Sequence, residues 1–78
     1  MALITDAGTG WSTPVTLTSD EIWQTRKGSL FLTTTAAPAA DDGIVLNEGN
    51  AVQFAAGAQV QYRKAGPGDA WIVRESIG

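Results

Sequence analysis

The sequence predicts an all-β fold, a small antiparallel β-sandwich or barrel of jelly-roll-like form with about seven short strands. Short runs alternate apolar and polar residues, most clearly at 51–54 and 59–64, and this alternation is typical of strands with one buried face. Glycine and proline recur between the runs and mark tight connections. The same residues interrupt every window longer than about ten residues, so helical periodicity is not sustained.

The chain divides into a lead-in and one domain. Residues 1–12 are expected to be irregular, because glycines and short polar residues follow the first apolar residues, and terminal segments of this kind are often mobile. Residues 13–78 are expected to form a single β domain. Its first strand is predicted at 14–18, where Val15 and Leu17 alternate with threonines.

The next two strands are predicted on either side of the turn signal Gly28–Ser29. In residues 21–27 two large apolar side chains, Ile22 and Trp23, are adjacent, so the buried face of this strand is ambiguous. Residues 30–35 combine large apolar side chains with threonines, which suit a pleated and half-buried surface.

A loop and a series of short strands complete the chain. Residues 36–43 are predicted to be a loop, because Pro38 and the Asp-Gly punctuation disfavour a helix despite the alanines. The later strands are predicted at 44–46, 51–54, 59–64 and 70–75, separated by glycine-containing turns.

The core is predicted from the apolar positions that fall in phase along these strands. They are Leu30, Leu32, Leu46, Val52, Phe54, Val60, Tyr62, Trp71 and Val73. Three tryptophans are more than a core of this size comfortably encloses. We therefore treat Trp11, Trp23 and Trp71 as candidate interface residues, in preference to a sugar-stacking platform, because buried aromatic side chains contribute much of the contact area at interfaces.

Composition excludes several functions. The chain has no cysteine and no histidine, so thiolate and imidazole metal sites are excluded and the commonest general base is missing. We predict no catalytic residues, no cofactor and no metal site. The acidic pair Asp41–Asp42 lacks the spacing of a calcium loop, and nothing in the sequence brings Glu21, Glu48 and Glu75 together as an acid/base pair.

Charge and hydropathy also limit the partners. The net charge of −3 and only five basic residues argue against nucleic acid as a partner. No basic leader or long apolar run is present, so we expect no membrane partner and synthesis in the cytoplasm. A 78-residue chain without disulfides or metal is marginal as a monomer, which favours a homo-oligomer. The segments 13–18 and 30–35 are expected to offer exposed strand edges to a neighbouring copy.

Five segments carry a resemblance to a known type of protein. They are WQTRKG at 23–28, AAPAADDG at 36–43, LNEGNAVQF at 46–54, AGAQVQYRK at 56–64 and AWIVRE at 70–75. In their order and punctuation these segments resemble small all-β proteins encoded among the virion genes of phages and prophages, of the decoration, fibre-base or tail-accessory type.

The resemblance implies a non-enzymatic structural or attachment component of a phage or phage-derived particle. It further implies other virion proteins as partners, association with the virion and a trimer as the first expectation for the oligomer. The alternative function is that of a carbohydrate-binding β-sandwich module, because exposed aromatic side chains on a β face can stack on sugar rings.

Overall fold

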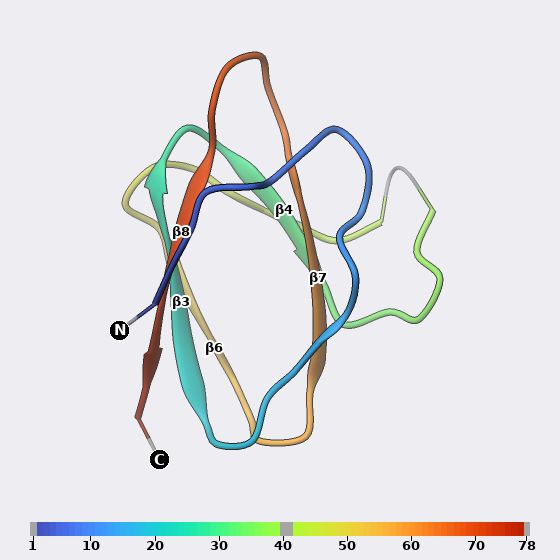
Figure 1. The fold of residues 1–78 in the computed structure, drawn as a ribbon, viewed down its shortest axis with the longest axis vertical. Coiled ribbons are helices and arrows are strands. Elements are labelled where there is room, and N and C mark those ends of the chain that lie inside the picture. The colour runs from blue at the N-terminus through green and yellow to red at the C-terminus, as the bar shows by residue number, and fades with distance from the viewer. Residues whose placement is uncertain (1, 40–41, 78) are drawn as a thin grey trace.

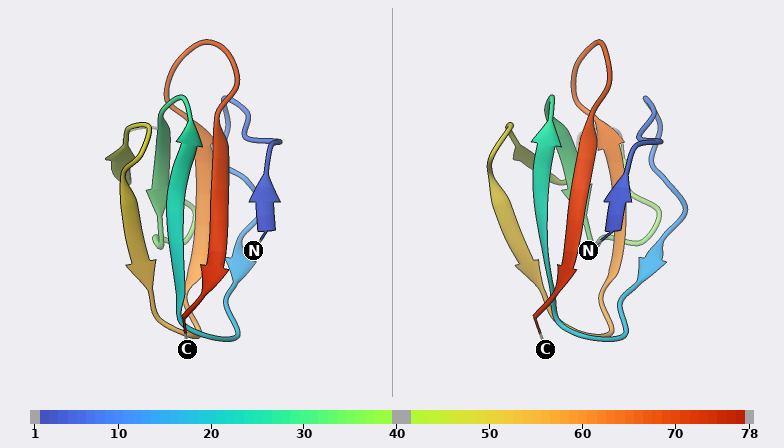
Figure 2. Two further views of the ribbon diagram at one scale, coloured as in Figure 1. Left: turned by 90° about the vertical axis from the view of Figure 1, so that its left-hand side faces the viewer. Right: turned by 60° about the vertical axis from the view of Figure 1, so that its left-hand side comes forward.

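The computed structural model describes residues 2–39 and 42–77, and these residues form an all-β structure of eight strands with no helix. The strands lie in two four-stranded antiparallel sheets packed face to face, which Figure 2 shows with one sheet in front of the other. The predicted fold class is therefore confirmed, with one strand more than expected. The strands are β1 (Ala2–Ile4), β2 (Val15–Thr16), β3 (Glu21–Lys27), β4 (Leu30–Thr33), β5 (Ile44–Leu46), β6 (Ala51–Phe54), β7 (Gln59–Lys64) and β8 (Trp71–Ser76).

The strand order is that of a jelly roll. One sheet, here called sheet A, has the order β1-β8-β3-β6, and the other, sheet B, has the order β2-β7-β4-β5. The antiparallel pairs β1·β8, β2·β7, β3·β6 and β4·β5 make the chain one long hairpin that is rolled up on itself. The loop between β4 and β5 is the tip of this hairpin, and it projects to one side of the molecule in Figure 1.

Four strands lie at the sheet edges. These are β1 and β6 in sheet A, and β2 and β5 in sheet B. The edge expected within residues 13–18 is confirmed, because β2 is an edge strand. The edge expected at 30–35 is wrong: β4 lies between β7 and β5. An apolar strand such as β4, with Leu30, Leu32 and Thr33 all buried, suits a central position.

The core lies between the two sheets. Five of the nine predicted core residues belong to this buried cluster, namely Leu30, Leu32, Leu46, Val60 and Tyr62. Val73 is also buried, but on the other face of its sheet. Val52 and Phe54 are half-buried and pack against the cluster from β6. Leu17, Trp23, Ala70 and Ile72 complete the buried apolar cluster.

Strand β8 differs from the prediction in the face that it buries. Ile72 is fully buried and lies opposite the buried Thr25 of β3, so these two residues face the core. Successive side chains of a strand point to opposite faces, which places Trp71 and Val73 on the outer face of sheet A. Three consecutive apolar residues, 71–73, leave the phase of the strand open, so the sequence pattern alone does not distinguish Ile72 from the pair Trp71 and Val73.

The lead-in is more ordered than predicted. Ala2–Ile4 forms β1 and pairs with β8, which corrects the expectation that residues 1–12 are wholly irregular. The following residues contain no regular strand, but their backbone is attached to β7. The Lys64 N–H donates to the Gly8 carbonyl at 2.8 Å, and the Ser12 N–H donates to the Tyr62 carbonyl at 2.9 Å.

Candidate interaction surface

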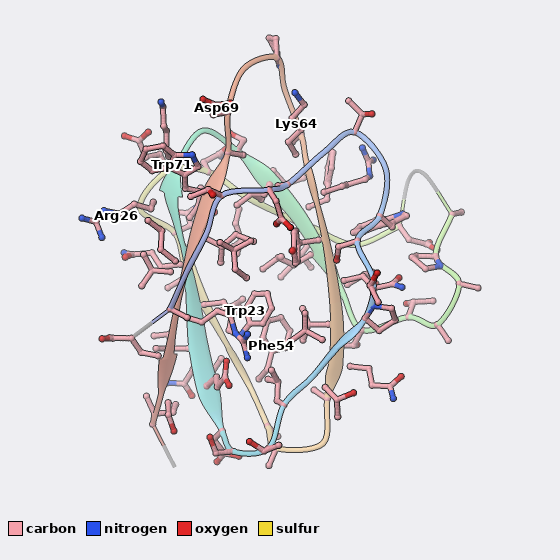
Figure 3. The ribbon with its side chains drawn as sticks, in the orientation of Figure 1. Trp23, Arg26, Phe54, Lys64, Asp69 and Trp71 are labelled. Carbon is pink, nitrogen blue, oxygen red and sulfur yellow. The ribbon has the colours of Figure 1, made fainter. Side chains whose placement is uncertain are left out.

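The three tryptophans singled out by the sequence occupy three different environments. Trp23 is 0% exposed and packs between the sheets, with its ring edge-on to Phe54 at a centroid distance of 5.7 Å. Figure 3 shows both side chains directed into the space between the sheets. Trp23 therefore has no exposed surface for a partner, and of the three candidates only Trp11 and Trp71 can contribute to an interface of the folded chain.

Trp23 is held in place by an ion pair. The indole Nε1 donates to Glu21 Oε1 at 3.0 Å, and Arg74 donates to both carboxylate oxygens of Glu21, at 2.9 and 3.0 Å. The Arg74 guanidinium also lies over the Trp23 ring, 4.9 Å from its centroid. The hydrogen bond from Arg74 is the main reason that the pKa of Glu21 is held below its usual value. This arrangement fixes a core side chain and leaves the Glu21 carboxylate fully engaged.

Trp71 lies on the outer face of sheet A. The Lys27 ammonium sits 4.7 Å from the centre of its ring. Figure 3 shows Trp71 and Arg26 on the side of the sheet that faces away from Trp23. On the same face the register aligns Leu3 of β1 with Val73 of β8, and Leu3 is 48% exposed. This face is a mixed surface of apolar and cationic groups.

Trp11 lies against sheet B, next to Arg63 of β7. The Arg63 guanidinium is positioned over two rings, 5.2 Å from the centre of Trp11 and 4.1 Å from the centre of Phe31. The indole Nε1 donates to the Ala39 carbonyl at 2.8 Å, which joins the lead-in to the loop between β4 and β5. A glycine is required beneath it: Gly43 has a φ of +100°, and a Cβ there would come within 2.7 Å of the Leu32 carbonyl and 3.0 Å of the Trp11 ring.

An open depression of about 510 Å³ lies between the lead-in and β7. Its lining includes Trp11, Ser12, Asp6 and Tyr62. The Tyr62 hydroxyl donates to Asp6 Oδ1 at 2.8 Å. Burial, and then the hydrogen bond to Asp6 and the negative charge of that carboxylate, raise the pKa of Tyr62 to about 12. The phenol thus stays protonated at neutral pH, and the depression presents hydroxyl, carboxylate and indole groups.

The acidic residues do not converge. Glu21 and Glu75 lie on neighbouring strands but face opposite sides of sheet A, since Glu75 is the register partner of Ile22. Glu48 lies in the turn after β5, where its Oε1 accepts the Gly28 N–H at 3.3 Å. Asp42 Oδ2 accepts the Ala39 N–H at 2.8 Å, whereas Asp41 lies outside the described residues. Within the part of the chain that is described, no three acidic residues cluster in a way that could hold a metal ion.

The β5 edge is the feature that sequence reasoning missed. Ile44 and Val45 are adjacent, and they are 47% and 52% exposed. Because they are consecutive in a strand, they expose apolar surface on both faces of the sheet edge. An open space of about 330 Å³, lined in part by Ile44 and Phe54, adjoins this edge between the two sheets. The only sequence signal was the uninterrupted apolar run at 44–46, which indicates a strand buried on both faces.

No family model, curated protein or solved structure matches this chain. The described residues also include no helix with the length and hydropathy that crossing a membrane requires.

Proposed function

We propose that this protein is a non-enzymatic structural or attachment component of a phage or phage-derived particle, and that it works as a homo-oligomer bound to other virion proteins. The observation that carries the proposal is the apolar surface outside the core, above all Ile44 and Val45 on an edge strand. Edge strands of stable monomers are usually blunted by charge, proline or bulges. An apolar edge supports a role in which another chain covers it.

The geometry of the rest of the molecule agrees with a binding role. The pKa of Tyr62 is raised to about 12 and its hydroxyl is hydrogen-bonded to Asp6, which makes the phenol a poor acid or base at neutral pH. The Glu21 carboxylate is occupied by Trp23 and Arg74. Both the phenol and the carboxylate are engaged in hydrogen bonds within the fold, and we therefore propose no chemical step for either.

Self-association is tested by light scattering over a concentration series that reaches about 100 µM, well above the range of specific micromolar association. We expect a mass of more than one chain, with a trimer as the starting expectation from the family resemblance. A mass of one chain at every concentration would defeat the oligomer and shift weight to the alternative function.

Particle association is tested by labelling purified particles from the source organism with antibodies against this chain, and unlabelled particles would contradict the proposal.

The carbohydrate-binding alternative is favoured by one observation, the depression beside Trp11. It combines an indole with the Asp6 carboxylate and the Ser12 hydroxyl, and these groups can stack on a sugar ring and bond to its hydroxyls. A glycan array provides the test. Binding that is lost in Trp11→Ala but kept in the control Trp71→Ala would establish this function, and an absence of binding to any glycan would remove it.

A further inference from the structure

We propose that the β5 edge pairs with the β5 edge of a second copy of this chain, antiparallel and about a two-fold axis at Val45. The pairing joins two copies of sheet B into one continuous sheet. This inference rests on the proposed self-association and specifies the surface that produces it, with a two-fold pair in place of the trimer expected from the resemblance.

The direction of the backbone groups follows from hydrogen bonds on β7. The Ala65 N–H donates to the Ser29 carbonyl, next to the start of β4, whereas the N–H and C=O groups of Tyr62 bond to Ser12 on the other side of β7. In an antiparallel sheet each residue directs both groups to the same neighbour, and successive residues alternate between the two neighbours. Arg63 therefore directs its backbone groups toward β4, where its register partner is Phe31.

The same alternation of backbone groups applies to β4 and β5. Because Phe31 bonds toward β7, Leu30 and Leu32 bond toward β5. Their register partners there are Leu46 and Ile44. Val45, which lies between those two partners, must then direct its N–H and C=O away from β4. Within the described residues β4 is the only strand paired with β5, so these two groups lie at the free edge of sheet B.

This arrangement is self-complementary. When two such edges meet about a two-fold axis, Val45 of each copy donates its N–H to the Val45 carbonyl of the other, which forms one closely spaced hydrogen-bonded pair. Ile44 then lies opposite Leu46 of the second copy, on the core-facing side. The two exposed side chains of the edge, Ile44 and Val45, both gain apolar neighbours.

The open space beside the edge supports a second copy as the occupant. The sheets are not closed here, and the opening is lined by Ile44 and Phe54 together with the threonines at 33–35. A second copy paired through β5 places its Leu46 opposite Ile44, so the exposed Ile44 side chain of each chain gains an apolar neighbour at the opening. The paired segment has only three residues in each chain, which is short of a standard interface and indicates a weak contact that gains strength where many copies are held together.

The other edge of sheet B supplies a matched control. The Leu17 N–H donates to the Ala58 carbonyl next to β7, so by alternation Thr16 of β2 directs its own N–H outward, as Val45 does. A proline at either position removes an outward N–H and no hydrogen bond within the sheet. We expect Val45→Pro to abolish the concentration-dependent rise in mass measured by sedimentation, while Thr16→Pro retains it. Circular dichroism of both variants checks that the fold is kept.

A charge-pair experiment tests the register and remains decisive if Val45→Pro fails to fold. Val45→Glu and Val45→Lys each place like charges opposite one another at the two-fold axis, whereas their mixture places opposite charges there. We expect each variant alone to be monomeric and the mixture to form the dimer. Failure of the mixture to associate, with both variants folded, overturns the two-fold register.

The outcomes separate this inference from the proposed function. A two-fold contact produces even-numbered assemblies. If the protein forms a trimer, or any oligomer that Val45→Glu leaves unchanged, the inference is overturned but self-association stands. If the unmodified chain is monomeric up to about 100 µM, well above the micromolar range of weak specific contacts, both the inference and the proposed self-association are overturned.

Discussion

The two edges of sheet B are built in opposite ways. On one side β2 has two residues, Pro14 precedes it, and the lead-in continues alongside β7 through hydrogen bonds at Gly8 and Ser12. On the other side β5 has three apolar residues, and no charge or proline lies within it. Proline and a covering loop are known protections of sheet edges. One side of the jelly roll is therefore closed by its own chain, and the other is left for a neighbour.

The two sides also differ in how well they enclose the core. On the closed side Tyr62 is buried and its hydroxyl is bonded to the lead-in. On the open side Phe54 is only half-buried and borders the space next to Ile44. Figure 2 shows β5 and β6 along the same side of the sandwich, away from β1 and β2. The stability of an isolated chain should therefore depend more on its closed side and centre than on its open side.

The largest effect is expected at the centre of the core. Trp23→Ala should lower the free energy of unfolding by about 3–5 kcal/mol, because the ring is fully enclosed and its removal leaves a cavity. Phe54→Ala should cost about 2 kcal/mol, because the open side lets water reach the site. Urea unfolding measures both free-energy losses. It is followed by far-ultraviolet circular dichroism, because the fluorescence of Trp23 is lost in one of the variants. Equal losses would mean that the open side is closed in solution.

A smaller effect is expected from the polar link on the closed side. Tyr62→Phe should lower the free energy of unfolding by about 1 kcal/mol. The substitution removes a hydrogen bond to the lead-in, and water can then hydrate the Asp6 carboxylate. Since the folded state raises the pKa of Tyr62 to about 12, stability should hold below about pH 10 and fall as the pH rises through about 12. A spectroscopic titration of the phenol measures this pKa, and Asp6→Asn should lower it by removing the charge.

In Asp6→Asn the phenol should still titrate above its ordinary range, because burial is the largest cause of the shift. A pKa near 10 in both proteins would show that the lead-in does not cover Tyr62 in solution.

The smallest effect is expected at the exposed edge itself. Ile44→Thr should change the free energy of unfolding of the dilute protein by less than about 0.5 kcal/mol, as is usual at the surface. Val15→Thr on β2 should cost about 1 kcal/mol, because Val15 packs against the core and the hydroxyl would be partly buried. Thermal unfolding at low concentration gives the comparison. A larger loss for Ile44→Thr than for Val15→Thr would reverse the assignment of the two sides.

The alternating patterns were sufficient to predict the fold class and most of the core. Val60 and Tyr62 alternate cleanly with polar neighbours, and both are buried. Where apolar residues are consecutive, local pattern does not determine the buried face. The choice between Trp71 and Ile72 depends on register with β3, which is a long-range property.

Two further features also depended on partners distant in the sequence. Thr25 lies on the core-facing side of β3, where its hydroxyl donates to the Leu46 carbonyl of the opposite sheet at 3.2 Å, and a threonine gives no local sign of this. The exposure of Val45 arises only because the roll places β5 at an edge. The apolar run at 44–46 is visible in the sequence, but only the sheet topology shows that it forms an exposed edge strand.

The rolled hairpin has a consequence for the order in which the protein can be built. The last strand, β8, lies between β1 and β3, so sheet A is split until residues 71–76 are in place. Pairing of distant segments carries a high loop-closure entropy, and such topologies fold in about milliseconds to seconds. During synthesis β1 and β3 must wait with uncovered edges for a strand that has not yet been made. The chain is therefore most prone to aggregate before β8 docks, and a substitution that weakens β8 should lower the yield of folded protein more than its stability alone would suggest.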